Sequence, residues 1–179
     1  MSNIYKINND KFKSIYFSYN FTMAADEKKV SQNAVLAAIL CKSNEKYKTQ
    51  KEIEKYLNSL YGANFDINIE KFGDAFNVEF RIECINKKYL PKNEDVVERV
   101  LNFLYEAIYR PNIENSKFNE EAVNREKDFI IKRLSQRKDD KLKYAISRTE
   151  EILCDKEPFG IPIFRNKKRI KKDYASRVV

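Results

Sequence analysis

Residues 14–41, SIYFSYNFTMAADEKKVSQNAVLAAILC, change their apolar spacing once, and that change decides the fold. From Ile15 to Met23 every second side chain is apolar, which predicts a strand with one buried face. From residue 25 to residue 42 the apolar side chains recur at helical spacing and cover nearly the whole circumference of the predicted helix. Such a helix is expected to lie buried at the centre of its domain.

A second helix and a hairpin are predicted next. Thr49 and Glu52 form a capping-box pattern, in which each side chain can satisfy a free amide of the first helical turn. Gly62 stands where a left-handed C-terminal cap is easiest to make. Residues 65–69 and 76–84 both alternate between apolar and polar side chains, which predicts two antiparallel strands joined by a turn near Gly73.

Three further helices are predicted in the second half of the chain. Asn93 is expected to cap a helix that ends at Arg110, because the residue before proline is disfavoured in helical geometry. Asn119 is expected to cap the next helix, with a break at 138–140 before a last helix over 142–153. The resulting order predicts an α+β fold with a largely antiparallel sheet and helices packed on one face.

Composition is consistent with one soluble domain spanning residues 1–179. The chain is 42% apolar, with 12 Phe and 11 Tyr, enough for a packed core. The N-terminal segment lacks the apolar stretch of a signal peptide, and no run is long enough to cross a bilayer. A cytoplasmic location without a membrane partner is therefore expected. The tyrosines at positions 5, 16, 19, 47, 56 and 61 are interpreted as packing residues.

The net charge of +8 is concentrated at the C-terminal end. Residues 161–179 carry seven basic side chains and one acidic one, whereas the remaining 160 residues carry 28 basic and 26 acidic side chains. We describe residues 165–179 as the basic tail. Because the body of the chain is nearly balanced, a nucleic-acid surface along the whole chain is not expected.

Several kinds of catalytic site are excluded by the residue types present. The chain has no histidine, which rules out Ser-His and Cys-His catalysis and histidine-ligated metals. The three glycines are too scattered for a phosphate-binding loop. The three cysteines, also far apart, are interpreted as small buried hydrophobes. No carboxylates are paired on one predicted face, so an enzyme that uses only carboxylates is not supported.

Four stretches match a known half-domain in local sequence and in the order of their predicted elements: AVLAAILCKSNEK (34–46), KTQKEIEKYLNSLYGANFDI (48–67), FNEEAVNREKDFIIKRL (118–134) and SQRKDDKLKYAISRTEEILCDKEPFG (135–160). Together they resemble the N-terminal half-domain of the insulinase/pitrilysin, or mitochondrial processing peptidase-like, family of zinc peptidases. The likeness spans roughly residues 12–172. It is greatest to a bacterial branch of paired members that have lost catalytic residues.

The resemblance places the zinc-site positions on residues that cannot bind zinc. The two histidine positions of H-x-x-E-H fall on Ala34 and Ala38, the general-base glutamate on Ala37, and the third ligand on Arg133. Alanine offers no lone pair, and a guanidinium repels a cation. Glu126 aligns with a supporting acidic residue. The resemblance therefore implies a degenerate homologue that has no zinc chemistry and needs no cofactor.

One feature of the family could survive this loss. The strand after Gly62 stands where active relatives lay an extended peptide along a sheet edge, and Phe65, Asp66 and Ile67 occupy the matching positions. Strand addition requires only backbone N–H and C=O groups. An ordinary sheet strand remains the alternative interpretation, because backbone pairing alone carries little specificity.

The resemblance also implies partners. Full members of the family carry a second copy of the half-domain and close a chamber from two or four such units, whereas the likeness here ends after Lys172. A truncated gene product is expected, with a deliberately short subunit as the alternative. Uncovered apolar surface then predicts self-association or pairing with a full-length relative. The implied function is a non-catalytic subunit that pairs with an active peptidase and helps to form a peptide chamber.

A nucleic-acid-binding module is the competing hypothesis from another class. Residues 165–172, RNKKRIKK, could neutralise about six phosphates and bind without sequence preference. No aromatic side chain is interleaved in this run, and basic runs are more often solvated tails than binding sites. Nucleic acid is therefore not the expected partner.

Overall fold

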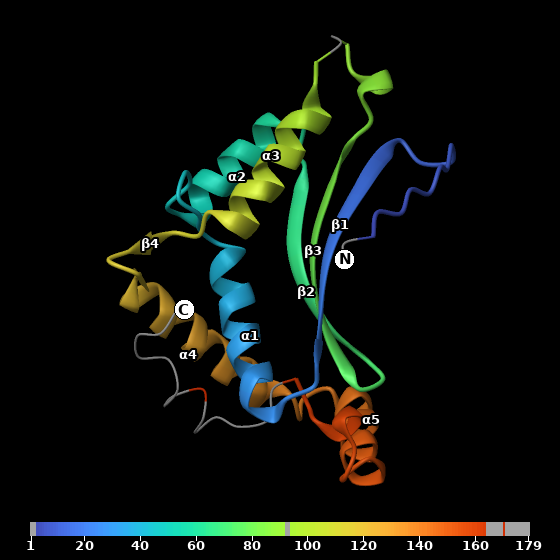
Figure 1. The fold of residues 1–179 in the computed structure, drawn as a ribbon, viewed down its shortest axis with the longest axis vertical. Coiled ribbons are helices and arrows are strands. Elements are labelled where there is room, and N and C mark those ends of the chain that lie inside the picture. The colour runs from blue at the N-terminus through green and yellow to red at the C-terminus, as the bar shows by residue number, and fades with distance from the viewer. Residues whose placement is uncertain (1–2, 92–93, 164–169, 171–179) are drawn as a thin grey trace.

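The computed structural model describes residues 3–91, 94–163 and 170. Its main helices and strands follow the order strand, helix, helix, strand, strand and three helices (Figure 1). A small hairpin with two residues in each strand and two short 3-10 helices complete the described elements. The elements are β1 (Ser14–Ala24), α1 (Glu27–Leu40), α2 (Gln50–Ser59), β2 (Asn64–Phe72), β3 (Ala75–Ile85), η1 (Lys87–Tyr89), α3 (Val96–Tyr109), β4 (Ile113–Glu114), β5 (Lys117–Phe118), α4 (Glu120–Gln136), α5 (Lys141–Leu153) and η2 (Pro158–Gly160).

The main sheet has three antiparallel strands in the order β1-β3-β2. All eleven residues of β1 pair with β3, from Ser14 opposite Ile85 to Ala24 opposite Ala75. The β2–β3 hairpin closes at Gly73, whose φ of +53° is a conformation that glycine adopts without strain. Because the ladders contain no bulge, apolar side chains share one sheet face and polar side chains share the other.

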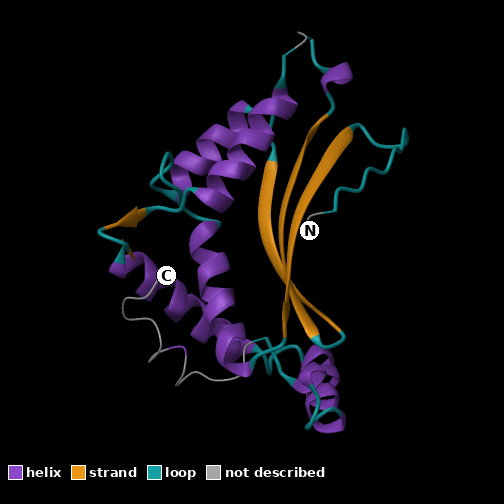
Figure 2. Ribbon diagram, in the orientation of Figure 1, coloured by secondary structure: helices purple, strands orange, loops and turns teal. Residues whose placement is uncertain are grey.

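Helices α1, α2 and α3 cover the apolar face of the sheet (Figures 1 and 2). At the centre of this core Phe103 of α3 contacts Phe65 of β2 edge to face, with ring centroids 5.2 Å apart. The polar face is occupied by cross-strand hydrogen bonds such as Asn77 to Asn20 (2.8 Å) and by the Arg81–Asp66 ion pair (2.7 Å). The expected α+β fold, with helices on one face of an antiparallel sheet, is confirmed.

A second, smaller cluster lies between α1 and α4. It contains Val35 and Ile39 from α1, Val123 and Ile130 from α4, and Ile170, which is only 1% exposed. Ile170 is the one described residue of the basic tail, so this point of the tail is anchored in the core. The other residues of the tail lie outside the described part of the chain.

Most predicted helix and strand boundaries are confirmed, and three details differ. The cap of α3 is Asp95, whose carboxylate accepts from the amide of Glu98, and the predicted cap Asn93 lies outside the described residues. The β4–β5 hairpin was not predicted; its turn residues Asn115 and Ser116 both have positive φ. The interpretation of all six tyrosines as packing residues is wrong, because the side chains at positions 5, 16, 19 and 61 are 83%, 54%, 36% and 45% exposed.

Candidate functional site

The positions expected to bind zinc lie on α1, in the interior of the domain. Ala34 and Ala37 are each 4% exposed, and Ala38 packs at the edge of the α1–α4 cluster. Ala34 and Ala38 are one helical turn apart and share a face of α1, as two ligands of H-x-x-E-H would. Their methyl groups supply packing and no donor atom. At these positions α1 therefore contributes packing alone.

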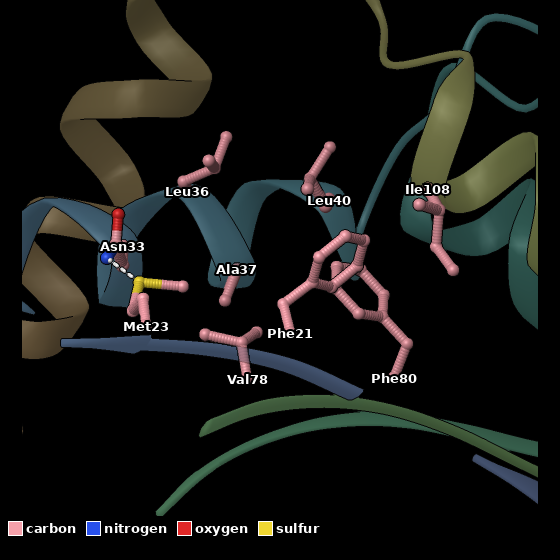
Figure 3. A pocket seen from close by; sticks show the side chains of 9 residues that line it. All are labelled: Phe21, Met23, Asn33, Leu36, Ala37, Leu40, Val78, Phe80 and Ile108. Carbon is pink, nitrogen blue, oxygen red and sulfur yellow. Dashed lines mark hydrogen bonds between the residues drawn. The ribbon is translucent and has the colours of Figure 1, made fainter. Parts of the chain in front are cut away.

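A cavity of about 260 Å³ lies beside the expected general-base position, between α1 and the apolar face of the sheet (Figure 3). Its lining is apolar except for Asn33, whose Nδ2 lies 2.7 Å from Sδ of Met23. The full lining is Phe21, Met23, Asn33, Leu36, Ala37, Leu40, Val78, Phe80 and Ile108. A cavity with this lining can hold an apolar group, but it has no side chain able to take a proton from water.

An ion pair with one buried partner lies one turn further along α1. Glu126 of α4 is 1% exposed, and its Oε2 lies 3.0 Å from Nζ of Lys42, just beyond the end of α1. This contact is within ion-pair distance, although its angles fall outside hydrogen-bond geometry. Lys42 also lies 5.1 Å above the ring of Phe129. A buried carboxylate requires a positive partner, and here Lys42 provides that charge.

Arg133, at the expected third ligand position, is exposed on α4, two turns beyond Glu126. The structure therefore does not bring it into the buried space between α1 and α4. The residues that do face α1 from this helix include Val123, Glu126 and Ile130. Sequence analysis did not identify Lys42 as a partner. The signal was present, because Glu126 shares an otherwise apolar face of its helix and so needs a nearby cation.

Cys41 connects the ion pair to the edge of the sheet. Burial raises the pKa of its thiol to about 11, and the carboxylates of Asp66 and Glu126 add to this rise. The backbone amide of Ile67 and the ammonium of Lys42 act in the opposite direction. Because a nucleophilic cysteine needs a lowered pKa, this partly buried thiol acts as a packing group and not as a nucleophile. Of the three cysteines expected to be buried, only Cys84 is fully so.

The expected peptide-binding edge is the outer edge of β2. Phe65 is buried in the core, whereas Asp66 is partly exposed and forms the ion pair with Arg81. The amide of Ile67 donates to Oδ1 of its neighbour Asp66 at 2.9 Å and lies close to the thiol of Cys41. An added strand would have to displace this carboxylate to reach the amide. Peptide binding at these positions stays a prediction.

The side chains at the expected site do not fit a zinc ion. Three of the four ligand and base positions carry methyl groups, and the fourth carries an exposed guanidinium. Across residues 3–91, 94–163 and 170, no group of three or more histidine, cysteine, aspartate or glutamate side chains is arranged to hold a metal. Over the same residues, no helix has both the length and the apolar character needed to cross a bilayer.

These features agree with the resemblance to an insulinase-type half-domain, with alanine side chains packed at the positions expected to bind zinc. Similarity to a curated protein supports this resemblance. Over 157 residues the chain is 25% identical to the "Probable inactive metalloprotease YmfF" of Bacillus subtilis (strain 168). The aligned region covers 88% of this chain and 37% of that protein. The chain is thus a homologue of a protein described as an inactive metalloprotease.

A solved structure with the same fold extends the comparison. A conserved protein from Enterococcus faecalis V583 superposes with a TM-score of 0.85 at 24% identity, which establishes the shared fold. The match covers 93% of this chain and 39% of that protein, so the chain spans about two fifths of the length of both relatives. No family model matches the sequence.

Proposed function

We propose that this chain acts as a non-catalytic, peptidase-like subunit that pairs with an active peptidase and contributes a wall to a peptide chamber. The observation that carries the proposal is the ion pair between Lys42 and Glu126 beside the alanine positions of α1. A side-chain cation compensates the buried carboxylate, so protein groups alone hold α1 against α4 at this point. A scaffold maintained in this way is suited to binding a partner or a peptide and not to hydrolysis.

The outer edge of β2 is the surface of this subunit that we propose contacts extended peptides. Phe65 fixes the strand in the core, and Asp66 controls access to the amide of Ile67. Strand addition along this edge would supply backbone hydrogen bonds, while selectivity would come from the displaced carboxylate. A basic peptide would compensate Asp66 better than an acidic one.

The experiment that tests the proposal is co-expression of the chain with a full-length relative that has an intact H-x-x-E-H motif. We expect the two chains to purify together and the pair to hydrolyse quenched fluorescent peptides, whereas this chain alone has no activity. Zinc analysis of the purified chain alone should give well below one ion per chain. One bound zinc per chain, or hydrolysis by the chain alone, would refute the proposal.

A matched pair of variants tests the peptide edge within that complex. Asp66→Asn keeps a side-chain oxygen for the amide of Ile67, whereas Asp66→Ala leaves that amide free. We expect the alanine variant to change the KM of the complex for extended peptides by several-fold and the asparagine variant to change it less. Equal KM values for both variants and the parent chain would place peptide binding elsewhere.

A further inference from the structure

We propose that residues 138–161, which include α5 and η2, form a hinged flap that two groups of ion pairs hold closed, so that a rise in ionic strength opens it while the rest of the domain stays folded. We call these residues the α5 flap. Figure 1 shows α5 beyond the tip of the β2–β3 hairpin, apart from the helices that cover the sheet. The proposal does not depend on the peptide-chamber function.

Both ends of the α5 flap are fixed to the folded domain. On the N-terminal side, α4 packs on α1 through Val123 and Ile130, and a turn over residues 137–139 separates α4 from α5. On the C-terminal side, Pro162 is buried, and Ile170 is held in the cluster between α1 and α4. Movement of the flap is therefore confined to the segment between these two anchors.

The side of α5 that faces the domain is not apolar. Its partly covered side chains are three polar ones and a tyrosine: Tyr144, Ser147, Glu150 and Glu151. Its large apolar side chains are more than half exposed: Leu142, Ile146, Ile152 and Leu153. Among the described residues, neither apolar cluster includes a member of α5. Burial of apolar area therefore contributes little to the position of α5, and polar contacts hold it.

The first group of contacts centres on Lys71, close to the tip of the β2–β3 hairpin. Its Nζ donates to Oε2 of Glu150 at 2.8 Å and to the carbonyl oxygen of Phe159 at 3.0 Å. The same ammonium lies 4.6 Å from the centre of the Phe159 ring. The lysine side chain is only 15% exposed, so these contacts replace water around its charge. One lysine therefore holds both α5 and η2 against the sheet.

The second group of contacts joins α5 to the end of α4. The guanidinium of Arg137 forms an ion pair with Glu151 at 2.7 Å and also donates to the hydroxyl of Ser147. Arg148, on α5 itself, contacts the other carboxylate oxygen of Glu151. Burial alone would raise the pKa of Glu151, but hydrogen bonds from the two guanidinium groups lower it below its ordinary value. The carboxylate therefore stays charged, and Arg137 ties it to α4.

Ionic strength acts selectively on contacts of this kind. The Debye length falls from about 30 Å in 0.01 M salt to about 3 Å in 1 M salt, which weakens attraction between partly exposed charges. Salt does not weaken the apolar clusters that hold α1 and the sheet in the same way. A released helix of 13 residues is only marginally stable alone in water. Opening of the flap therefore exposes the amides of α5 to exchange, while α1 and the sheet keep their protection.

The test is hydrogen–deuterium exchange of the chain, followed by mass spectrometry, in about 0.01 M and about 1 M NaCl. We expect α5 to exchange about five-fold faster or more at the higher salt concentration, while α1 and β3 change by less than about two-fold. Equal exchange of α5 at both salt concentrations would overturn the proposal. A parallel acceleration in α1 would also overturn it, because the whole domain would then be opening.

Matched variants show whether the ion pairs are responsible. Glu151→Gln keeps the size of the side chain but removes the charge that Arg137 and Arg148 share. We expect α5 of this variant to exchange faster than the parent in low salt and to respond less to added salt. Lys143→Gln is the control, because Lys143 pairs with Asp140 at the start of the same helix and should leave α5 as in the parent. Identical exchange of α5 in the two variants would contradict the proposal.

A second variant keeps the test decisive if Glu151→Gln impairs folding, which a loss of protection in α1 would reveal. Glu150→Gln removes the charged partner of Lys71 and leaves the contacts of Arg137 in place. We expect faster exchange of α5 in low salt, with α1 unchanged. Exchange of α5 as slow as in the parent would overturn the proposal, because the contacts of Lys71 would then not hold the flap.

Discussion

The ammonium of Lys42 lies 3.0 Å from the carboxylate of Glu126 and joins the end of α1 to the first half of α4. Glu126 is 1% exposed, and its other nearby cation, Arg125, is more distant at 3.5 Å and mostly in solvent. Lys42→Met keeps the length of the side chain but leaves the carboxylate without its closest partner. We expect a loss of about 1–3 kcal/mol in the free energy of unfolding, measured by urea denaturation.

Removing the carboxylate of the pair should lower the free energy of unfolding less than removing the lysine does. Glu126→Gln removes the buried charge and leaves Lys42, whose side chain is 31% exposed, free to reach water. Lys143→Met is a suitable control, because the lysine in its pair with Asp140 is 85% exposed and such pairs contribute little. If Lys42→Met were no more destabilising than Lys143→Met, the pair between Lys42 and Glu126 would contribute no more than a solvent-exposed pair.

The cavity beside Ala37 predicts that a larger apolar side chain is tolerated there. Ala37→Leu adds three methylene-sized groups to an apolar space of about 260 Å³, and we expect a gain of about 1–2 kcal/mol. Ala34→Leu places the same group at a buried position that does not line the cavity and should destabilise by about 1–3 kcal/mol. Thermal unfolding of both variants checks the difference in sign.

Local signals in the sequence predicted the fold well. The strict alternation from Ile15 to Met23 corresponds to β1, because only one face of that strand meets the helices. The capping box at Thr49 and Glu52 forms as predicted, with both hydrogen bonds present. Gly73 closes the β2–β3 hairpin with positive φ. Each of these signals depends on neighbours close in the chain, so periodicity and turn chemistry were sufficient.

Contacts between distant residues were not predictable in the same way. Lys42 and Glu126 are far apart in sequence, and only the antiparallel packing of α1 on α4 brings them together. Exposure of Tyr19 was missed for a related reason. Its place in the alternation assigns it to the apolar face but does not show that β1 is an edge strand, where that face is only partly covered.

The raised pKa of Cys41 predicts a specific loss of stability at high pH. Its thiol has a pKa of about 11 in the folded state, above the ordinary value of 9.0, so folding retains the proton. The resulting stability is present below about pH 9 and is lost as pH rises toward about 11. Between about pH 8 and 10.5 the urea midpoint should fall more for the parent chain than for Cys41→Ala. Parallel pH profiles would contradict this account of the thiol.

Ile170 tests whether the basic tail contributes to the folded domain. Its side chain is 1% exposed among Val35, Ile39 and Val123, so Ile170→Ala should cost about 2–4 kcal/mol. Ile152→Ala, at a side chain 65% exposed on α5, serves as the control and should change stability by less than about 0.5 kcal/mol. If Ile170→Ala matched this control, the tail would be independent of the core and available for nucleic acid.

Gly160 tests the turn that follows α5. A Cβ built at this position would lie 2.0 Å from the carbonyl oxygen of Cys154, a backbone atom that cannot move aside cheaply. The turn is held against the sheet by Lys71, whose Nζ donates to Oε2 of Glu150 at 2.8 Å and to the carbonyl of Phe159 at 3.0 Å. Gly160→Ala should therefore displace the turn and break these contacts. We expect a loss of about 1–3 kcal/mol and faster amide exchange in α5.

Gly73→Asn is the matched control for this glycine. No atom lies within 4 Å of a Cβ at that position, and asparagine tolerates its φ of +53°. Stability should therefore change by only a few tenths of a kcal/mol. The two substitutions separate steric crowding from backbone conformation as the reason for glycine. If Gly160→Ala left the exchange of α5 unchanged, the contacts of Lys71 would not position this turn.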